Sequence, residues 1–390
     1  MLEGIVTWAE IDLDAIRFNV RAFQKHVGPK VEIIAVVKAN AYGHGAVPVA
    51  RAALEAGAAR LAVHRVIEGI ELRRAGITAP VLVMGYTPPS GAELITRWGL
   101  TPSLMTIEFA QALSARATAL GVRVPVHVKV DTGMSRYGLQ PEEVNDFLLA
   151  LRRLPGITLE GMFTHFATAD SADQSHLRRQ LAVFNDVRAA VSEAGIYIPC
   201  LHACNSAAAM RLPEAHFHAI RPGISMYGLK PSDEWEPVFE IRPALTLKSL
   251  VSRVRTLPAG AGVSYGRTYI TERPTPAALV PVGYGDGYHR ILSNKGSVLI
   301  RGKRARILGR VCMDQFVVDV SDIPDIQQDD EVVLVGSQGE ERISAEEVAR
   351  LAGTINYEVT TSLLPRVARI YLKGGKVVEA NVLGVSGSSS

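Results

Sequence analysis

Apolar runs of strand length alternate with helical patterns through the first 230 or so residues. Stretches such as 106–121 and 176–195 carry apolar residues at three- and four-residue spacing and end on Gly, which predicts amphipathic helices. Eight alternations predict a parallel (β/α)8 TIM barrel; a doubly wound open sheet also alternates, but eight units favour closure. The predicted barrel strands are residues 32–38, 60–64, 80–85, 100–105, 124–130, 159–165, 198–203 and 218–223.

The pattern changes at about residue 244 to strands separated by Gly and Pro turns. One short helix is predicted over 344–353, with Ser344 as N-cap and Glu347 three residues later. These features predict a mainly antiparallel β domain at the C terminus. We therefore expect a barrel domain over 1–240, a β domain over 241–383 with the boundary near 237–243, and a disordered tail over 384–390.

Composition narrows the class of protein. Lys and Arg total 42 and Asp and Glu 39, so a net charge of +3 argues against nucleic acid or an anionic membrane as partner. No apolar run is long enough for a membrane span, and the N-terminal sequence lacks the pattern of a secretory signal, so we expect a cytoplasmic protein. The three cysteines, Cys200, Cys204 and Cys312, fit no metal-binding spacing, and no metal is expected.

Chemistry-bearing side chains gather at the carboxyl ends of the predicted strands, where barrel enzymes place their active groups. Cations and histidines are unusually frequent among them, which predicts an anionic ligand. The residues at or just after these strand ends are Lys38, Tyr42, His64, Lys129, Arg136, His165, His202, Asn205, Ser206, Arg221 and Gly223.

Lys38 ends the first predicted barrel strand and has two interpretations. A lysine at a strand end can reach water. A lysine at the mouth of an apolar pocket instead loses hydration, its pKa falls, and the neutral amine can bond to an aldehyde. The backbone around Gly223 and the hydroxyls of Ser206 and Tyr42 could bind a phosphate, so lysine and phosphate site together indicate pyridoxal phosphate.

Nine segments follow one another along the chain in this order: AVVKANAYGHG (35–45), HVKVDTGMSRYG (127–138), GMFTHFATAD (161–170), HACNSAA (202–208), RPGISMYG (221–228), GVSYGRTY (262–269), GYGDGY (283–288), GRVCMDQ (309–315) and INYEVTT (355–361). Together they resemble the motifs of the alanine racemase family. The resemblance implies a pyridoxal phosphate enzyme built from a barrel and a β domain, which racemises L- and D-alanine and supplies D-alanine for peptidoglycan. It also implies a homodimer in which the partner's C-terminal domain completes each active site.

The resemblance assigns the catalytic roles. Lys38 would hold the cofactor and act as the base on the D side, and Tyr265 of the other subunit would act on the L side. Two bases on opposite faces of Cα are needed, because a single group tends to return the proton to the face it left. His165 and Arg221 would support the tyrosine. Arg221 would also face the pyridine nitrogen as a donor that stays protonated, oriented by His202.

The remaining roles also follow from the resemblance. Arg136 and the backbone N–H of Met313 would bind the substrate carboxylate, and Lys129 would be carbamylated and so steady Arg136. Ser135 and Tyr137 depart from the family, which more often has Gly and a smaller aliphatic residue there. The further cofactor-binding residues would be Tyr42, Asn205, Ser206, Tyr357 and the backbone of Gly223 and Ile224, and the substrate access corridor would include Asp170, Tyr284, Arg290 and Arg310.

Three other functions share part of these features. A basic amino-acid decarboxylase of the same fold has an acidic pyridine partner, which Arg221 contradicts. A serine or broad-specificity racemase is disfavoured by the missing secretory signal and by Tyr357, which favours a small substrate side chain. A non-catalytic pyridoxal phosphate carrier would lack both the β domain and Tyr265.

Overall fold

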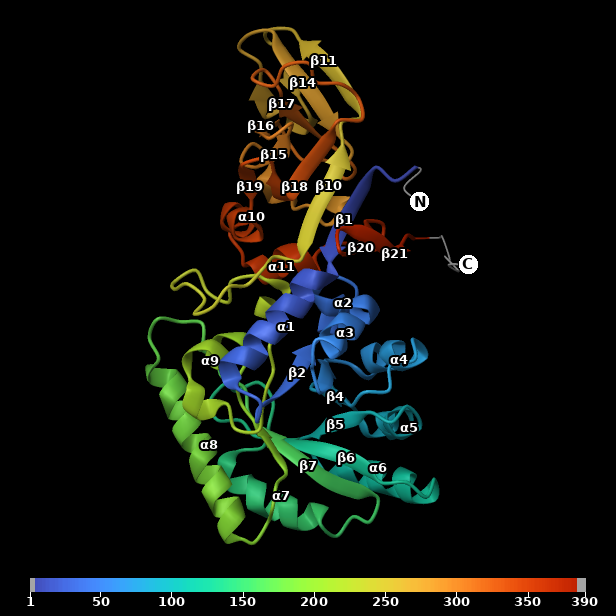
Figure 1. Ribbon diagram of the computed structural model, residues 1–390, viewed down its shortest axis with the longest axis vertical. Helices are drawn as coiled ribbons and strands as arrows, with labels where there is room; N and C mark the ends of the chain where they lie inside the picture. Colours follow the sequence, from blue (N-terminus) through green and yellow to red (C-terminus); the bar gives the residue numbers. More distant parts are fainter. Residues whose placement is uncertain (1–3, 384–390) are drawn as a thin grey trace. The chain divides into compact units, whose positions relative to one another are not determined.

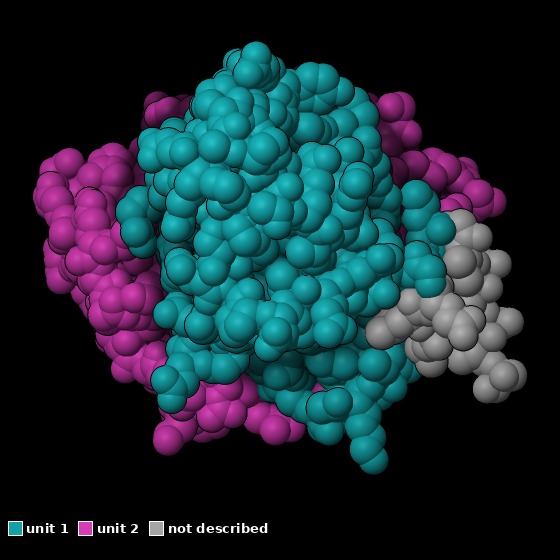
Figure 2. Space-filling view, turned by 90° about the horizontal axis from the view of Figure 1, so that it is seen from above, with its two compact units in different colours: residues 1–15, 42–45, 243–390 teal, residues 16–41, 46–242 magenta. Residues whose placement is uncertain are grey.

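The computed structural model describes residues 4–383. The predicted disordered tail, 384–390, lies outside the described residues. The chain divides into two compact units, which Figure 2 distinguishes by colour. Unit 1 comprises residues 1–15, 42–45 and 243–390, as far as these are described, and unit 2 comprises residues 16–41 and 46–242.

Unit 2 is a closed barrel of eight parallel strands, as predicted (Figure 1). Each strand pairs in parallel with the next in sequence, and β2 closes the ring by pairing with β9. The strand residues are almost all buried because a barrel strand has side chains both inside the ring and beneath the helices. The strands are β2 (Glu32–Val36), β3 (Arg60–Val63), β4 (Val81–Val83), β5 (Thr101–Leu104), β6 (Val124–Lys129), β7 (Ile157–Phe163), β8 (Cys200–His202) and β9 (Ala219–Ile220).

Helices follow the strands around this barrel. The long helix α8 shows the expected pattern, with buried residues such as Leu177, Leu181 and Phe184 at three- and four-residue spacing. The helices from the start of the chain through unit 2 are α1 (Leu13–Val27), α2 (Lys38–Tyr42), α3 (Ala46–Glu55), α4 (Val66–Arg74), α5 (Ala92–Arg97), α6 (Ile107–Ala119), α7 (Val144–Leu151), α8 (Ser175–Glu193) and α9 (Ser206–Arg211).

Unit 1 contains a mainly antiparallel sheet, also as predicted. Its path is β11-β14-β17-β16-β15-β18-β10-β1-β20-β21, with β19 paired to β18, and β12 and β13 form a separate hairpin. Helix α10 (Ala345–Ala352) has the predicted cap, because the Ser344 hydroxyl accepts from the Glu347 backbone N–H. The other elements are α11 (Asn356–Thr361), β1 (Thr7–Asp12), β10 (Leu245–Leu250), β11 (Arg253–Leu257), β12 (Gly262–Val263), β13 (Tyr269–Ile270), β14 (Thr275–Val280), β15 (Ser297–Ile300), β16 (Lys303–Leu308), β17 (Phe316–Asp319), β18 (Glu331–Gln338), β19 (Glu341–Ile343), β20 (Ala368–Lys373) and β21 (Lys376–Asn381).

The start of the chain differs from the expected domain limits. A barrel domain over 1–240 would include β1, but β1 pairs antiparallel with β10 and parallel with β20 in the sheet of unit 1. Ala9 and Ile11 are fully buried there. Residues 42–45 also belong to unit 1 by their contacts. The physical reason is the same in both places: these segments find their packing partners more than 200 residues away.

Two further findings concern metal binding and membrane-spanning helices. Between residues 4 and 383, no cluster of three or more His, Cys, Asp or Glu is arranged to hold a metal ion. None of the helices in that range combines the length and apolar character needed to cross a membrane.

Candidate active site

Lys38 begins a left-handed turn directly after the first barrel strand. Ala39, Asn40 and Ala41 have φ of 52° to 53° and ψ of 47° to 51°. Such a conformation costs about 1–2 kcal/mol for each residue with a side chain, so the surroundings must stabilise it. Hydrogen bonds do so: the Ala39 N–H donates to the Glu68 carboxylate at 2.6 Å, and the Ala46 N–H donates to the Asn40 side chain at 2.9 Å.

The Lys38 amine lies in a half-buried, cationic environment. Burial lowers its pKa, and the charge of Arg136 lowers it further, while Glu68 acts in the opposite direction. Burial and the Arg136 charge therefore increase the neutral fraction of the amine, which is the nucleophilic form. These surroundings are those expected of a lysine whose neutral amine bonds to an aldehyde.

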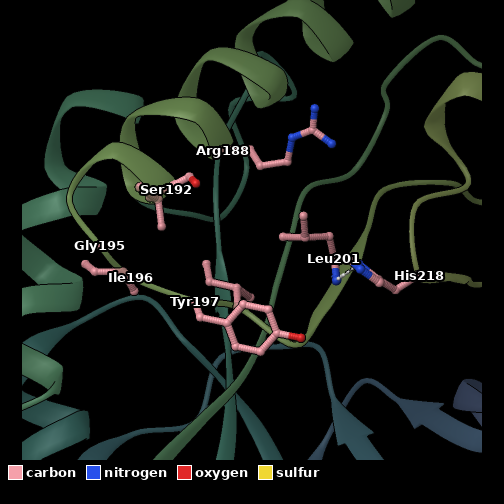
Figure 3. Close-up of a pocket in the computed structure, with 9 residues that line it drawn as sticks. Arg188, Ser192, Gly195, Ile196, Tyr197, Leu201 and His218 are labelled. Atoms are coloured by element: carbon pink, nitrogen blue, oxygen red, sulfur yellow. Dashed lines mark hydrogen bonds between the residues drawn. The ribbon is translucent and has the colours of Figure 1, made fainter.

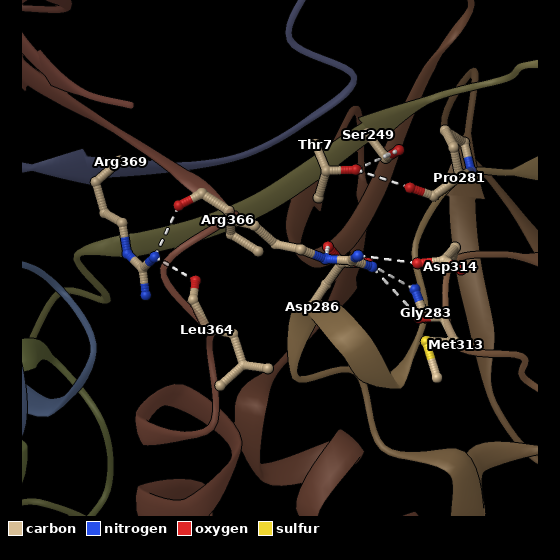
Figure 4. Close-up of polar contacts among 11 residues, drawn as sticks. Thr7, Ser249, Pro281, Gly283, Asp286, Met313, Asp314, Leu364, Arg366 and Arg369 are labelled. Atoms are coloured by element: carbon tan, nitrogen blue, oxygen red, sulfur yellow. Dashed lines mark hydrogen bonds and ion pairs between the residues drawn. The ribbon is translucent and has the colours of Figure 1, made fainter. Parts of the chain in front are cut away.

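The segment after this turn is packed within unit 1. Tyr42 is buried, which raises its pKa, so its hydroxyl keeps its proton. The ring centroids of Tyr42 and Tyr357 lie 6.1 Å apart. Arg369 holds the backbone by donating from Nε to the Gly43 carbonyl at 3.2 Å. The same guanidinium donates to the carbonyls of Leu364 and of Val367, which links this segment to the chain between α11 and β20 (Figure 4).

Position 43 has no room for a side chain in this packing. Its φ is +87°, and an added Cβ would collide with the Thr360 carbonyl. We expect Gly43→Ala to lower the free energy of unfolding by about 3 kcal/mol, since backbone strain and overpacking add. Gly28→Ala is the matched control, because Gly28 has φ +83° but open space around it, and we expect about 1 kcal/mol there. Urea unfolding of both variants measures the difference, and equal losses would contradict the packing given to Gly43.

Arg221 is a buried cation whose two Nη atoms are bound by groups of the barrel. It is 2% exposed and follows β9. Its Nη2 donates to the carbonyls of Thr164 at 2.8 Å and Ala203 at 2.9 Å, and its Nη1 donates to His202 Nδ1 at 2.6 Å. Burial lowers its pKa to about 10, so it stays a cation at neutral pH. A guanidinium held in this way can only donate hydrogen bonds.

His165 and His202 both lie against Arg221. Arg221 Nη2 lies 3.3 Å from His165 Nδ1. Burial lowers the pKa of both imidazoles far below the ordinary value, and the Arg221 charge lowers them further, so both are neutral. Because the guanidinium donates, each Nδ1 is an acceptor and each Nε2 carries the proton.

Lys129 lies among three other cations, Arg221, Arg136 and Lys38. Burial lowers the pKa of Lys129 to about 8, and Arg221, Arg136 and Lys38 contribute to the fall. The Lys129 Nζ lies 5.4 Å from the Tyr137 ring centroid. Tyr137, one of the departures from the family, thus supplies an aromatic face next to this amine.

Ser135, the other departure, has φ +54°, a conformation that favours glycine. The Asp131 carboxylate compensates by accepting backbone N–H bonds from Gly133, Met134 and Ser135 at 2.9 to 3.0 Å. The turn that carries Arg136 is therefore held from Asp131.

Hydroxyl and backbone groups gather where the start of α9 meets the segment that follows β9. Asn205 caps α9 by accepting from the Ala208 N–H. The Ser206 hydroxyl accepts from the Gly223 N–H at 2.8 Å. Ile224 begins the following 3-10 turn, Ile224–Tyr227, and the buried Ser225 Oγ beside it has no hydrogen-bond partner among residues 4–383. The structure thus brings these predicted cofactor-binding groups together.

Four predicted residues lie on adjoining loops of unit 1. The Ser264 hydroxyl donates to the Arg310 carbonyl at 2.6 Å, which joins the Tyr265 turn to the Arg310 segment. The Tyr284 and Gly285 N–H groups donate to the carbonyls of Cys312 and Met313. The side chains of Tyr265, Tyr284 and Met313 are exposed, and that of Tyr265 is 72% exposed.

An ion pair fixes the loops that carry Tyr284 and Met313. Arg366 binds the buried Asp286 carboxylate through Nε at 2.6 Å and Nη2 at 3.0 Å, and reaches Asp314 through Nη1 at 2.9 Å (Figure 4). Asp286 also accepts from the Gly283 N–H at 2.8 Å. Bidentate pairs of this kind constrain orientation as well as distance.

Asp170 and Arg290, predicted for the access corridor, are both exposed. Asp170 follows β7 in unit 2, where its carbonyl accepts from Trp235 Nε1 at 2.9 Å. Arg290 lies in unit 1, and its carbonyl accepts from Ser293. His64, left as a structural residue, has its backbone N–H bound by Glu68 at 2.7 Å.

A pocket of about 420 Å³ lies at the opposite end of the barrel strands, ahead of β8 and β9. Arg188, Tyr197 and His218 line it among apolar neighbours, and the Leu201 N–H donates to His218 Nδ1 (Figure 3). It contains none of the predicted site residues.

Sequence reasoning missed two polar residues of the barrel interior, His127 and Glu160. His127 Nδ1 lies 2.7 Å from His202 Nε2, and His127 Nε2 lies 3.1 Å from the Glu160 carboxylate. The sequence did mark both residues, since each is a polar residue within an apolar strand pattern. The pattern could not predict which side chains they contact.

Comparisons with known proteins agree with this geometry. Residues 11–231 match the family profile "Alanine racemase, N-terminal domain", and residues 244–371 match "Alanine racemase, C-terminal domain". An alanine racemase of Carboxydothermus hydrogenoformans is 49% identical over 94% of this chain and 99% of its own length.

Solved structures give the same result. That of the Clostridium difficile 630 alanine racemase has 40% identity and a TM-score of 0.93, covering 98% of this chain and 100% of that one. The Bacillus anthracis alanine racemase with bound L-Ala-P has 42% identity and a TM-score of 0.91, covering 96% and 97%. This chain belongs to the alanine racemase family of isomerases.

Proposed function

We propose that the chain interconverts L- and D-alanine with pyridoxal phosphate held at Lys38, by a two-base mechanism. The observation that carries the proposal is Arg221: a buried cation that can only donate stands among the groups expected to hold the cofactor. The family relationship supports alanine as substrate. The product D-alanine would serve peptidoglycan synthesis in the cytoplasm.

The residues fit the cofactor at three points. A half-buried lysine with a lowered pKa suits an aldehyde. Arg221 suits an unprotonated pyridine nitrogen, which accepts a hydrogen bond. Asn205, Ser206 and the backbone of Gly223 and Ile224 suit a phosphate, as does the Ser225 hydroxyl, which has no hydrogen-bond partner within 4–383. The hydroxyls of Tyr42 and Tyr357 are proposed for the same phosphate.

When bound, the cofactor supplies an electron-accepting ring that makes the α-proton of the attached amino acid acidic. In the proposal, Lys38 takes or returns this proton on the D side. Tyr265 of the partner subunit takes or returns it on the L side. An unprotonated pyridine withdraws electrons weakly, so Arg221 limits side reactions such as decarboxylation.

The tautomer of His165 allows this residue to support a tyrosine that acts as a base. Its Nδ1 faces the Arg221 donor, so its Nε2 carries a proton that it can donate. Donation to a phenol oxygen stabilises the negative charge that a tyrosine carries when it acts as a base. A neutral imidazole is suited to this role because it does not release its proton at neutral pH.

Arg136 and the Met313 backbone N–H are proposed to bind the substrate carboxylate. Lys129 is proposed to react as a neutral amine with carbon dioxide, forming a carbamate and releasing a proton. Its pKa of about 8 makes the neutral form accessible near neutral pH. The carbamate is negatively charged, so the Lys129 side chain would attract Arg136 instead of repelling it. Asp170, Tyr284, Arg290 and Arg310 are proposed for the corridor by which substrate reaches the site.

The proposed assembly is a homodimer with shared active sites. The exposure of Tyr265 supports it, because a catalytic tyrosine cannot act from water and needs a site that encloses it. The exposed Met313 and Tyr284 lie on loops that are hydrogen-bonded to each other, and Ser264 bonds the Tyr265 turn to the Arg310 segment, so all three side chains can enter a partner's site together.

Cofactor attachment tests the proposal. We expect the purified protein to show a visible absorption band that borohydride abolishes, with the cofactor then mapped to a peptide containing Lys38. Lys129→Ala is the matched control, since Lys129 is the other buried lysine of this region, and it should still be labelled at Lys38. The reduced protein should no longer racemise L-alanine. Labelling elsewhere, or racemisation that survives complete reduction, would contradict the proposal.

A further inference from the structure

A line of hydrogen bonds runs through the barrel interior from Arg221 toward the other end of the strands. Arg221 Nη1 meets His202 Nδ1 at 2.6 Å, and His202 Nε2 meets His127 Nδ1 at 2.7 Å. His127 Nε2 meets the Glu160 carboxylate at 3.1 Å. Arg60 binds the same carboxylate oxygen at 2.8 Å.

The two ends of this line fix its direction. Arg221 can only donate, and the ionised Glu160 can only accept. The pKa of Glu160 is lowered to about 2, first by the hydrogen bond from His127 and then by Arg60, so it is ionised at neutral pH. Each neutral imidazole has one donor and one acceptor, and only one arrangement satisfies all three bonds. Both His202 and His127 then carry their proton on Nε2.

Any other protonation state places two donors face to face. A proton on His202 Nδ1 would point at the Arg221 guanidinium, whether the imidazole were charged or of the other tautomer. Burial also lowers the pKa of both imidazoles, which favours their neutral forms.

The barrel is shaped around His127. An added Cβ at Gly161 would lie 2.5 Å from the His127 ring, so this glycine leaves the space that the imidazole occupies. The Phe163 ring stacks on His202, with centroids 4.8 Å apart and planes at 11°. Arg60 lies between Glu160 and the exposed Glu32, bonded to Glu32 at 3.0 Å, so the line ends at water.

From this geometry we propose that His127 and Glu160 are positioning residues for Arg221. They fix the tautomer of His202, which guarantees an acceptor for Arg221 Nη1 and restrains the guanidinium. Glu160 is also the countercharge at the end of the line, since no carboxylate contacts the Arg221 guanidinium directly among the described residues. This role rests on the function proposed for Arg221, but the tautomers can be tested without the cofactor.

The test is ¹⁵N nuclear magnetic resonance of the full chain, labelled at histidine and arginine and freed of cofactor. Nitrogen shifts distinguish protonated from unprotonated imidazole nitrogens, and removal of one histidine at a time identifies the signals. We expect His127 and His202 to be neutral with the proton on Nε2 from about pH 6 to 8. The Arg221 side-chain protons should exchange slowly with water.

Variants then separate positioning from general stability. His127→Phe should accelerate Arg221 side-chain proton exchange about 10- to 100-fold, the size expected when a hydrogen bond to a charged group is weakened. Glu160→Gln keeps an acceptor oxygen but removes the charge, so it should retain both tautomers and shift the His127 Nε2 proton signal. Ser114→Ala is the matched control, because it removes a buried hydroxyl of the same unit that lies on α6, accepts from the Gly156 N–H and is off the line. It should leave the histidine and Arg221 signals unchanged.

Either imidazole with its proton on Nδ1, or charged, would overturn the directed line. Unchanged Arg221 exchange in both His127→Phe and Glu160→Gln would overturn the positioning role even if the tautomers were as expected. If His127→Phe does not fold, Glu160→Gln alone decides, and an unmoved His127 signal there counts against the proposal. Failure of cofactor attachment at Lys38 would refute the proposed function and leave these results standing, so the two failures are distinguishable.

Discussion

Replacing Tyr265 by phenylalanine is expected to slow racemisation by about 10²- to 10⁴-fold, the usual contribution of a general acid or base. The variant should keep its cofactor, because Lys38 and Arg221 are intact. The loss should also be one-sided. In deuterated water, D-alanine should still exchange its α-proton through Lys38, whereas L-alanine should exchange far more slowly.

The one-sided result follows from geometry. Two bases on opposite faces of Cα each serve one enantiomer, so removing one leaves the other enantiomer's exchange intact. Mass spectrometry of recovered alanine measures both exchange rates in one experiment. Tyr269→Phe is the matched control, since it removes a tyrosine hydroxyl four residues away that is bonded to Arg306, and its rates should stay at the unmodified level. Equal residual exchange of both enantiomers would show that Tyr265 is not the L-side base.

The barrel could be predicted from sequence because several of its strands carry their own signal. A strand buried on both faces is a mainly apolar run, so the runs 32–38 and 80–85 predict β2 (Glu32–Val36) and β4 (Val81–Val83) without knowledge of their neighbours. Other strands, such as β5 (Thr101–Leu104), contain polar residues and are predicted from the alternation with helices. The order of the strands then follows from the alternation with helices, which restricts the connections to parallel neighbours.

Strand β1 lacked such a signal. The segment TWAEID, with its burial at Trp8, Ala9 and Ile11, is short, and its pairing depends on partners far along the chain. Thr7 and Ser249, whose hydroxyls lie 3.4 Å apart, are separated by 242 residues. Local sequence patterns do not reveal contacts of this range, so the sequence alone does not show that this segment leaves the barrel domain.

The candidate site shows a similar limit. Strand ends and motifs led to Lys38, Arg221 and Ser206, which the structure gathers at one end of the barrel. The left-handed turn after Lys38 could not be predicted, because two of its members are alanines, which have no preference for positive φ. It depends on Glu68, a hydrogen-bond partner 29 residues later than Ala39.

The shared active site can be tested by mixing two inactive chains. If Lys38 of one chain works with Tyr265 of its partner, a heterodimer of Lys38→Ala and Tyr265→Ala has one doubly damaged site and one intact site. Neither homodimer should racemise alanine. With equal expression and random pairing, about half of the dimers are mixed and the pool should recover about a quarter of full activity. Separate affinity tags allow the heterodimer to be purified and measured alone, where about half is expected.

A second, reciprocal mixture makes the test decisive, because the shared site and the single-chain site predict opposite results for it. A heterodimer of the unmodified chain with a chain carrying both Lys38→Ala and Tyr265→Ala has one lesion in each site if the sites are shared, so it should be inactive. If Lys38 and Tyr265 instead met within one chain, this heterodimer would keep one intact site, and the mixture of single variants would have none. Comparing the two purified heterodimers, both shown to be dimeric, therefore separates the arrangements whatever the absolute rates. An active reciprocal heterodimer beside an inactive mixture of single variants would refute the shared site.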